Sequence, residues 1–297
     1  MDMEKQRFLS EIEIDLLITL VSVPSFTEAA AALGLTQSAI SRAVNRLEEH
    51  FGVVLLTRGK GGCEATQELL RLQPRLWRAR QALEELNAIS GPAKSELAGK
   101  IRVVGFRSAI SVLLPESVST FMARHRRVRI SLATVPEIGG GVQKVILEAK
   151  ADFGLTTIRP SRALCSVPIG SDPYTVVRRK GTRRPSPREC LVLWKERCSE
   201  VVPRILQAHQ WNPIETMSVD NDLSVLAMVE HGAGYSIMPR LATQPLPSAL
   251  SRHPLAVPFR RDIWLCGRRE VWDTAMGVEF RRSVVEDLSK KLALLSD

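Results

Sequence analysis

The sequence of 297 residues lacks the motifs that link a fold through covalent or metal bonds. Its five cysteines are an odd number and include no C-x-x-C pair, and its five histidines are scattered with no H-x-x-x-H spacing. Disulfide frameworks need paired cysteines, and zinc sites need closely spaced ligands. The sequence therefore predicts neither a disulfide-stabilised fold nor a metal site, and we expect no cofactor.

Long apolar runs and a basic leader are also missing. The longest apolar stretches are far shorter than the roughly 20 residues that a membrane-spanning helix needs. The opening stretch MDMEKQRFLSEIEIDLL is acidic, whereas a secretory leader is basic, and no small-residue cleavage site follows it. We therefore expect a cytoplasmic protein that makes no membrane contact.

The net charge of +9 suggests a nucleic-acid partner, but its distribution does not. Residues 1–66 hold 6 basic and 9 acidic residues, a net charge of −3, whereas residues 100–297 hold 30 and 19, a net charge of +11. Solvated surfaces are the simplest explanation of the excess, and attraction of small anions is the second. Local motifs must therefore decide the function.

A helix-turn-helix is predicted between Ser25 and His50. Ser25 and Glu28 form the S-x-x-E signature of a helix start, and Gly34 suits the left-handed residue that ends a helix. Thr36 can cap a second helix that runs to about His50. Small and apolar residues recur on one face of each helix and let the two cross closely. They are Ala29, Ala30, Leu33, Ile40, Ala43, Val44 and Leu47.

The opposite face of the second helix is polar from its start. Gln, Asn and Arg have the geometry to read base edges in the DNA major groove, and Ser and Thr suit phosphate oxygens. The N-terminal part of a recognition helix is the part that enters the groove. A plain solvated surface is the alternative. The tight turn favours DNA contact by Thr36, Gln37, Ser38, Ser41, Arg42 and Asn45.

A short hairpin is predicted after the second helix. Val53–Thr57 has strand composition, a glycine-rich basic turn follows, and Cys63–Ala65 can return as a second strand. Such a hairpin would form a wing beside the recognition helix. Arg58 and Lys60 would then contact phosphate or the minor groove, with a solvated turn as the alternative.

The stretch SFTEAAAALGLTQSAISRAVNRLEEHFGVVLLTR resembles the DNA-binding domain of LysR-type transcriptional regulators, and the similarity covers residues 12–66. The resemblance implies that Gln37, Ser38, Ser41 and Arg42 meet DNA and that Arg58 is a wing contact. The wing itself departs from the family pattern. The family usually has another basic residue and a Leu-Thr pair there, whereas this sequence has Lys60-Gly-Gly and Ala65-Thr66.

A heptad pattern follows the wing. Its apolar residues are three and four positions apart in alternation: Leu69, Leu72, Leu76, Ala79, Leu83 and Leu86. So narrow a stripe favours pairing with another helix, with packing on its own chain as the alternative. Pro74 is predicted to kink the helix or weaken its first turns. The resemblance implies a linker helix that dimerises antiparallel to its partner. The Gly, Pro, Ser and alternating charges of residues 87–100 predict a hinge there.

Residues 100–297 alternate strand-like and helix-like segments, which predicts an α/β domain with mostly parallel sheets. The stretches GKIRVVGF, ADFGL and VEHGAGYSIMP resemble the family's effector-binding domain, which has two lobes like a periplasmic binding protein. We therefore expect an α+β multidomain chain. It would comprise a winged helix-turn-helix (1–66), a linker helix and hinge (67–99) and a two-lobed α/β domain (100–297), with lobe I at about 100–166 and 268–297 and lobe II at about 167–267.

Folds of this kind bind ligands between the lobes, at strand carboxyl ends and helix N-termini. Arg107 would pair with an anionic effector, with a plain surface arginine as the alternative. Ser108 can cap its helix and donate to a carboxylate of the effector, with a plain cap as the alternative. Glu137 stands where aromatic-acid regulators of the family commonly have a small hydroxyl residue. The candidate effector contacts are Arg107, Ser108, Glu137, Trp194, Lys195 and Asp222.

A small anionic metabolite is the effector that this pattern favours, because residues 100–297 carry a large positive charge. A thiol switch at Cys198 is the alternative signal, since peroxide-sensing members of the family keep a redox cysteine in this region. Inert cysteines at Cys190 and Cys198 are the simpler interpretation.

The sequence thus predicts a sequence-specific, ligand-responsive transcription regulator and no enzyme. Its partners would be double-stranded DNA with an interrupted inverted repeat, a small-molecule effector, and copies of itself as a homodimer through Leu69–Leu86 and a homotetramer. An enzyme on the same type of fold and a stand-alone solute-binding protein are the competing classes. No G-x-S-x-G or P-loop supports the first, and the helix-turn-helix opposes the second.

Overall fold

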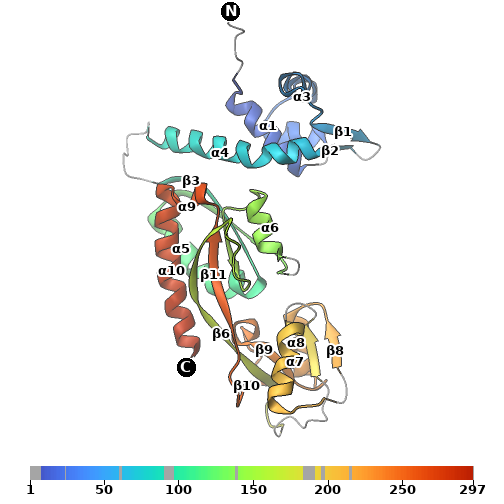
Figure 1. Ribbon diagram of the computed structural model, residues 1–297, viewed down its shortest axis with the longest axis vertical. Coiled ribbons are helices and arrows are strands. Elements are labelled where there is room, and N and C mark those ends of the chain that lie inside the picture. The colour runs from blue at the N-terminus through green and yellow to red at the C-terminus, as the bar shows by residue number, and fades with distance from the viewer. Residues whose placement is uncertain are drawn as a thin grey trace, which may run out of the picture. The chain divides into compact units, whose positions relative to one another are not determined.

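The computed structural model describes residues 8–23, 25–59, 62–89, 97–137, 140–182, 191–194, 198–213 and 216–296. The chain divides into two compact units at Gly99 and Lys100, whose elements are labelled in Figure 1. Within the described ranges, every helix is too short or too polar to cross a lipid bilayer.

The N-terminal unit consists of three helices, a hairpin and a long fourth helix. These are α1 (Glu11–Ser22), α2 (Phe26–Leu33), α3 (Gln37–Phe51), β1 (Leu56–Gly59), β2 (Gly62–Ala65) and α4 (Gln67–Ile89). Side-chain caps start the first three helices, because the hydroxyl oxygens of Ser10, Ser25 and Thr36 each accept a backbone N–H three residues on. The caps at Ser25 and Thr36 were predicted from the sequence.

Gly34 makes the turn between α2 and α3. Its φ of 65° lies in the left-handed region, where a side chain would strain the backbone. The N–H of Leu35 donates to Ala30 O across 3.0 Å, which closes the end of α2. Only two residues then separate Gly34 from the start of α3, so the helix-turn-helix agrees with the sequence prediction.

One apolar cluster joins the helices of this unit. Leu17 of α1, Ile40 and Leu47 of α3, and Leu69 and Leu76 of α4 are all buried in it. The other heptad residues Leu72, Ala79 and Leu83 pack against the same cluster, whereas Leu86 is 61% exposed. The heptad stripe therefore faces its own chain, and the prediction that the whole stripe faces a partner helix is wrong.

Helix α4 lies along α1 in the same unit. The guanidinium of Arg80 contacts Glu11 at 2.6 Å and Asp15 at 2.9 Å, which ties the start of α1 to the second half of α4. Helix α4 continues through Pro74 without a break. Residues 87–89 of the predicted hinge belong to α4, and its residues 90–96 lie outside the described residues.

The C-terminal unit contains a seven-stranded sheet in the order β10-β6-β11-β5-β3-β4, and β9 pairs with β6 beside this path. Its strands are β3 (Ala98–Gly105), β4 (Arg127–Thr134), β5 (Phe153–Thr156), β6 (Cys165–Arg179), β9 (Ser236–Pro239), β10 (Leu250–Pro254) and β11 (Arg260–Gly267). Strands β3 and β5 are parallel. The prediction of mostly parallel sheets is nevertheless wrong here, because β11 is antiparallel to β5 and β6, and β6 is antiparallel to β9 and β10.

Helices cover both faces of the part of this sheet that contains β3, β5 and β11 (Figure 1). They are η1 (Ala109–Leu113), α5 (Leu114–Arg124), α6 (Gly141–Leu147), α9 (Arg269–Trp272) and α10 (Ala275–Ser296). The rings of Phe121 in α5 and Phe280 in α10 meet edge to face at 5.4 Å. On the other face, α6 approaches so closely that a Cβ on Gly154 would lie 2.5 Å from Ile146 Cδ1.

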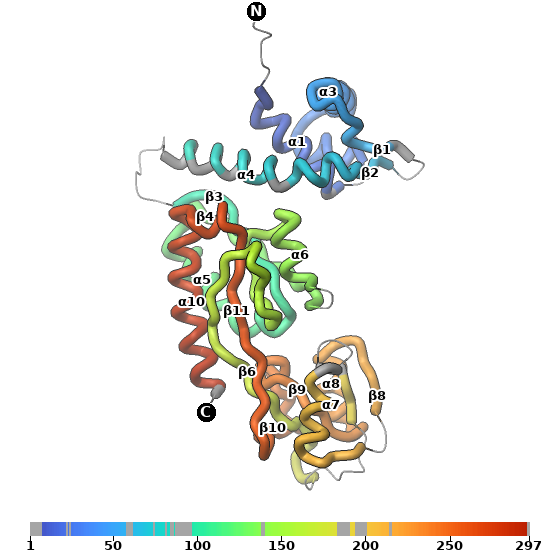
Figure 2. Tube along the Cα trace, in the orientation of Figure 1, coloured from blue at the N-terminus to red at the C-terminus, as the bar shows by residue number. Residues whose placement is uncertain are grey.

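Strand β6 changes partners at its middle. Pro173 is its last residue paired with β11, opposite Arg260, and Tyr174 is its first residue paired with β9. We call residues 174–259 lobe II and the remainder of the C-terminal unit, which includes β11, lobe I. The paired residues Pro173 and Arg260 join the two lobes, and we call them the neck. Figure 2 shows the chain entering lobe II along β6 and returning along β11.

Lobe II adds the elements β7 (Leu191–Trp194), α7 (Cys198–His209), β8 (Thr216–Val219), α8 (Asp222–Glu230) and η3 (Arg240–Thr243). Consecutive side chains of a strand point to opposite faces. Val176 accordingly packs with α7 residues such as Ile205, and Val177 packs with α8 residues such as Val225. Lobe II is therefore a layer of strands between two helices.

Candidate functional site

Helix α3 has one buried face and one polar face. Ile40, Ala43, Val44 and Leu47 are buried, while the six residues predicted to contact DNA lie on the other side. Ser41 is half-buried, and the other five are exposed: Thr36, Gln37, Ser38, Arg42 and Asn45. The structure thus brings all six together at the start and along the outer side of one helix.

The first turn of α3 orients its polar groups toward the helix N-terminus. Thr36 Oγ1 accepts the N–H of Ala39 at 3.2 Å and lies 3.1 Å from Ser38 Oγ. Arg42 Nε donates to the carbonyl oxygen of Ser38 at 3.3 Å, which lays the arginine along the helix. The four N–H groups on its two Nη atoms make no hydrogen bond within the described part of the chain. Arginine can use such groups to donate two parallel hydrogen bonds to O6 and N7 of a guanine.

The β1–β2 hairpin is held against the end of α3 by Glu48. Its Oε1 accepts the backbone N–H groups of Leu55 at 2.8 Å and Leu56 at 3.2 Å. The first strand was predicted at Val53–Thr57 but begins at Leu56, because Glu48 holds the chain immediately before it. Arg58 pairs in register with Cys63; its side chain, and the whole of Lys60, lie outside the described residues.

In the C-terminal unit, Arg107 links the two lobes. It follows β3, and its Nε donates to Asp222 Oδ2 of α8 at 2.5 Å. Its Nη2 donates to the carbonyl oxygen of Ala242 in η3 at 3.1 Å, and its Nη1 to Ser111 Oγ at 3.1 Å. Arg107 and Asp222, two of the predicted effector contacts, therefore form an ion pair with each other across the lobes.

Asp222 lies in the first turn of α8, directly after the cap Asn221. It is 1% exposed, and its second oxygen, Oδ1, is buried with no hydrogen-bond partner among the described residues. Nearly all buried polar atoms in proteins have a partner, so an orphaned carboxylate oxygen needs an explanation. The helix N-terminus offers the carboxylate partial positive charge.

Ser108 belongs to a second junction at the neck. Its hydroxyl accepts Arg261 Nη2 at 3.3 Å, and Arg261 pairs with the fully buried Asp172 at 2.9 Å. Asp172 Oδ1 also accepts the N–H of Leu241 in η3 at 3.0 Å. Burial raises the pKa of Asp172, and the Arg261 charge opposes that rise.

The expectation that Ser108 caps a helix is wrong. Its φ and ψ of −69° and −24° are already helical, and its side chain makes no cap hydrogen bond. The helix that follows opens with the π-helical turn η1, a geometry that often occurs at functional sites. Ser108 is 2% exposed and faces Arg261.

Glu137 lies at the same edge of the sheet, after β4. It is 4% exposed, and its two carboxylate oxygens accept the backbone N–H and the hydroxyl of Thr157, which follows β5. Gly141 begins α6 next to it, where a Cβ would lie 2.1 Å from the carbonyl oxygen of Pro136. Close backbone approach explains this glycine.

The other predicted effector contacts fall at the edge of the described structure. Trp194 ends β7, but its side chain is outside the described residues, as are Lys195, Cys190 and the side chain of Cys198. Sequence reasoning missed Asp172, Arg261 and Thr157. A charged residue inside the strand-forming stretch around Asp172 was the available signal, because strands rarely bury an aspartate without a partner.

Families of known proteins match both units. Residues 13–68 match the lysR family of bacterial regulatory helix-turn-helix proteins, and residues 94–289 match the LysR substrate binding domain. The chain is also similar to the probable HTH-type transcriptional regulator LrrA of Synechococcus elongatus. The two are 30% identical over 266 residues, which cover 84% of this chain and 88% of LrrA.

Solved full-length regulators show the same fold. A full-length OxyR variant from Pseudomonas aeruginosa has a TM-score of 0.70 and 15% identity, covering 95% of this chain and 98% of its own. Full-length LysG from Corynebacterium glutamicum with its bound effector Arg has a TM-score of 0.62 and 16% identity, covering 95% and 99%.

Proposed function

Because the chain belongs to the LysR family of transcription regulators, with a DNA-binding domain ahead of an effector-binding domain, we propose how it recognises both ligands. Helix α3 reads an operator in the major groove, and a small anionic effector binds between the lobes at Arg107. The observation that carries the proposal is the ion pair between Arg107 and Asp222. A competing anion would break that contact.

DNA recognition is assigned to the polar face of α3. Arg42 has unengaged Nη donors for a guanine, and Gln37 is exposed in the first turn. Ser38 and Thr36 at the helix N-terminus would contact phosphate, where the helix dipole also favours a negative charge. Arg58 in the wing would add a phosphate contact.

The operator would be an interrupted inverted repeat read by two copies of the chain. Since the heptad stripe faces its own core, the dimer contact is assigned to apolar residues that stay exposed near the contact between α1 and Arg80. Ile12 is 60% exposed and Leu86 is 61% exposed, and Phe8 lies just before α1 with 84% exposure. Pairing of effector-binding domains would then give a homotetramer.

The effector would act by competing with Asp222 for Arg107. Guanidinium binds carboxylate and phosphate groups in paired hydrogen bonds, so an anionic effector offers Arg107 an equivalent partner. A donor group beside that acid would suit Asp222 Oδ1, which is buried without a partner. Breaking the pair changes the contact between the lobes, and the effector shifts the equilibrium because it binds one lobe arrangement better. A coupling of about 1–3 kcal/mol to DNA binding is enough for regulation.

Native mass spectrometry of the full-length protein would identify small acids that it retains. Operator binding, measured by fluorescence anisotropy, should then respond to such an acid in the parent and in an Arg162→Lys control, in which one exposed arginine is changed. The response should be lost in Arg107→Lys, which keeps the charge but loses the paired hydrogen bonds. Operator binding that instead responds to peroxide, and loses this response in Cys198→Ser, would overturn the effector proposal in favour of a thiol switch.

A further inference from the structure

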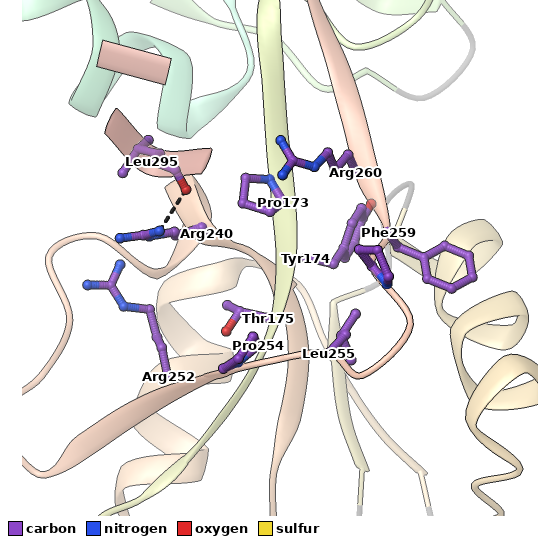
Figure 3. Close-up of a pocket in the computed structure, with 11 residues that line it drawn as sticks. Pro173, Tyr174, Thr175, Arg240, Arg252, Pro254, Leu255, Phe259, Arg260 and Leu295 are labelled. Carbon is purple, nitrogen blue, oxygen red and sulfur yellow. Dashed lines mark hydrogen bonds between the residues drawn. The ribbon is translucent and has the colours of Figure 1, made fainter. Parts of the chain in front are cut away.

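A pocket lies at the neck, where the chain passes between the lobes. It has a volume of about 390 Å³ and is lined by parts of β6, η3, β10, β11 and the end of α10. Figure 3 shows its lining side chains. None of the six candidate effector contacts is among them, so this pocket is separate from the site proposed at Arg107.

The charges that line the pocket are all positive. Arg240, Arg252 and Arg260 contribute three guanidinium groups, and none of the lining residues is an aspartate or a glutamate. Figure 3 shows Arg240 and Arg252 next to each other, with Arg260 across Pro173. Burial lowers the pKa of Arg252, and the nearby charge of Arg240 lowers it further.

Neutral oxygens are the partners of this arginine pair. Arg240 Nη1 donates to the carbonyl oxygen of Leu295 at 2.6 Å, and Arg252 Nη1 lies 3.4 Å from Thr243 Oγ1. Neither guanidinium has a carboxylate partner among the described residues. Each guanidinium carries five N–H donors, so several donors on each stay available to a ligand. Two close cations without a counter-charge repel each other, and an anion between them would remove that cost.

Apart from Arg260 and the hydroxyl residue Thr175, the rest of the lining is largely apolar. In Figure 3, Pro254 lies between Arg252 and Leu255, Leu255 lies on the side away from the arginine pair, and the ring of Phe259 points outward. Ligand pockets commonly combine an apolar wall with a few placed charges, and the volume suits a molecule of about one ring plus an acidic group. We propose that this pocket is a binding site for a small organic anion, whose phosphate or carboxylate group lies between Arg240 and Arg252 and whose apolar body packs on Pro254 and Leu255.

The pocket shares one short segment with the contacts between the lobes. Within η3, Arg240 lines the pocket, Leu241 donates its N–H to Asp172, and Ala242 accepts from Arg107. A ligand that fixes Arg240 would therefore stiffen the segment that both inter-lobe junctions use. This gives the site a route to the lobe arrangement that does not require contact with Arg107.

The experiment is a calorimetric titration of the full-length protein, without DNA, with three probes. Phenyl phosphate and phenylacetate distinguish the two acid types, and inorganic phosphate tests the acid without an apolar body. We expect at least one aromatic probe to bind once per chain and more tightly than inorganic phosphate. Arg240→Gln and Arg252→Gln should each weaken that probe by about tenfold or more, because a charge-assisted pair is lost. Arg162→Gln should leave its affinity unchanged, and Arg107→Lys should weaken it far less than either pocket variant does.

Hydrogen exchange supplies a second readout of the same site. Bound probe should slow exchange of the Leu241 amide in the parent and not in Arg252→Gln, whose fold is checked by circular dichroism. If Arg252→Gln is unstable, Arg252→Lys serves in its place, because it keeps the positive charge and loses the paired N–H donors of the guanidinium. Three results would overturn the proposal: no aromatic probe binds, inorganic phosphate binds as tightly as the aromatic probes, or binding is lost in Arg107→Lys and kept in both pocket variants. The last result would place the probe at the inter-lobe site.

Discussion

Arg107 in lobe I and Asp222 in lobe II are 115 positions apart in the sequence, and their side chains meet at 2.5 Å. The Arg107 side chain is 21% exposed and that of Asp222 is 2% exposed, so the carboxylate depends on this partner more than the guanidinium does. The pair can therefore be tested by substituting either residue, and the two substitutions should lower the free energy of unfolding by different amounts.

Arg107→Met should be the more destabilising change, because it leaves a buried carboxylate without its counter-charge. Removing one partner of a buried pair costs about 3–5 kcal/mol, and the partial exposure here favours the lower end. Asp222→Asn should cost less, and the double variant should be more stable than Arg107→Met alone. Urea unfolding followed by tryptophan fluorescence measures this, since four of the five tryptophans lie beyond residue 100. Equal stability of Arg107→Met and the parent would contradict the assignment.

Two arginines of the N-terminal unit should affect DNA binding in different ways. Arg42→Ala should lose about 1–3 kcal/mol at one base position of the operator, because it removes a base contact. Arg58→Ala should weaken binding to all sequences alike and reduce the salt dependence by about one counterion, because it removes a phosphate contact. Anisotropy with operator variants at several salt concentrations separates the two. Arg75→Ala, at an exposed position of α4, is the control, and an Arg42→Ala protein that keeps full operator specificity would refute the assignment.

Substitutions of leucines in the heptad stripe should have different effects according to how buried each leucine is. Leu76 is 4% exposed in the core of the DNA-binding unit, so Leu76→Asp should unfold or strongly destabilise that unit. Leu86→Asp should leave the unit folded, because Leu86 is 61% exposed, and should weaken the dimer instead. Thermal unfolding and sedimentation velocity report the two effects. A Leu86→Asp protein with the parent's assembly would place the dimer surface elsewhere.

Acidification should weaken lobe II through His253. Burial lowers the pKa of His253 below its ordinary 6.5, and the Arg178 guanidinium lowers it further. The unfolded chain therefore binds a proton more readily than the folded one. This contribution to stability is fully present above about pH 6.5 and is lost as the pH falls through the folded-state pKa.

The measurement is the difference in unfolding free energy between pH 7.5 and pH 5.5. His253→Gln should reduce that difference. An unchanged pH dependence in His253→Gln would show that His253 does not titrate as stated.

Local features of the fold were predictable from the sequence, and contacts over long separations were not. The caps at Ser25 and Thr36 and the turn at Gly34 depend on neighbouring residues, so a short window contains all of their information. The heptad stripe has the same spacing whether it faces α1 or a partner chain, and only the fold distinguishes these. Strand β10, with the sequence LSRHP, was missed because it is polar and contains a proline.

The candidate site divides in the same way. Arg107, Glu137 and Asp222 could be proposed as effector contacts because they lie at predicted strand ends and helix starts. The residues that they contact could not be predicted. The ion pair of Arg107 with Asp222 and the pair of Arg261 with Asp172 join segments 115 and 89 positions apart. No periodicity or spacing encodes such pairs. They exist because β6 and β11 bring both lobes to one neck.

Pro173 and Arg260, where the chain enters and leaves lobe II, are direct partners in the sheet. Residues 174–259 are therefore an insertion between two paired strands of lobe I, β6 and β11. An insertion whose ends already meet imposes little on the host fold, because closing it adds only a slowly growing entropy term. A short turn would connect β6 directly to β11. Residues 174–259 would also be replaceable by another domain whose two ends are equally close. This architecture would let lobe II be replaced while lobe I, which adjoins the DNA-binding unit in the chain, keeps its sheet.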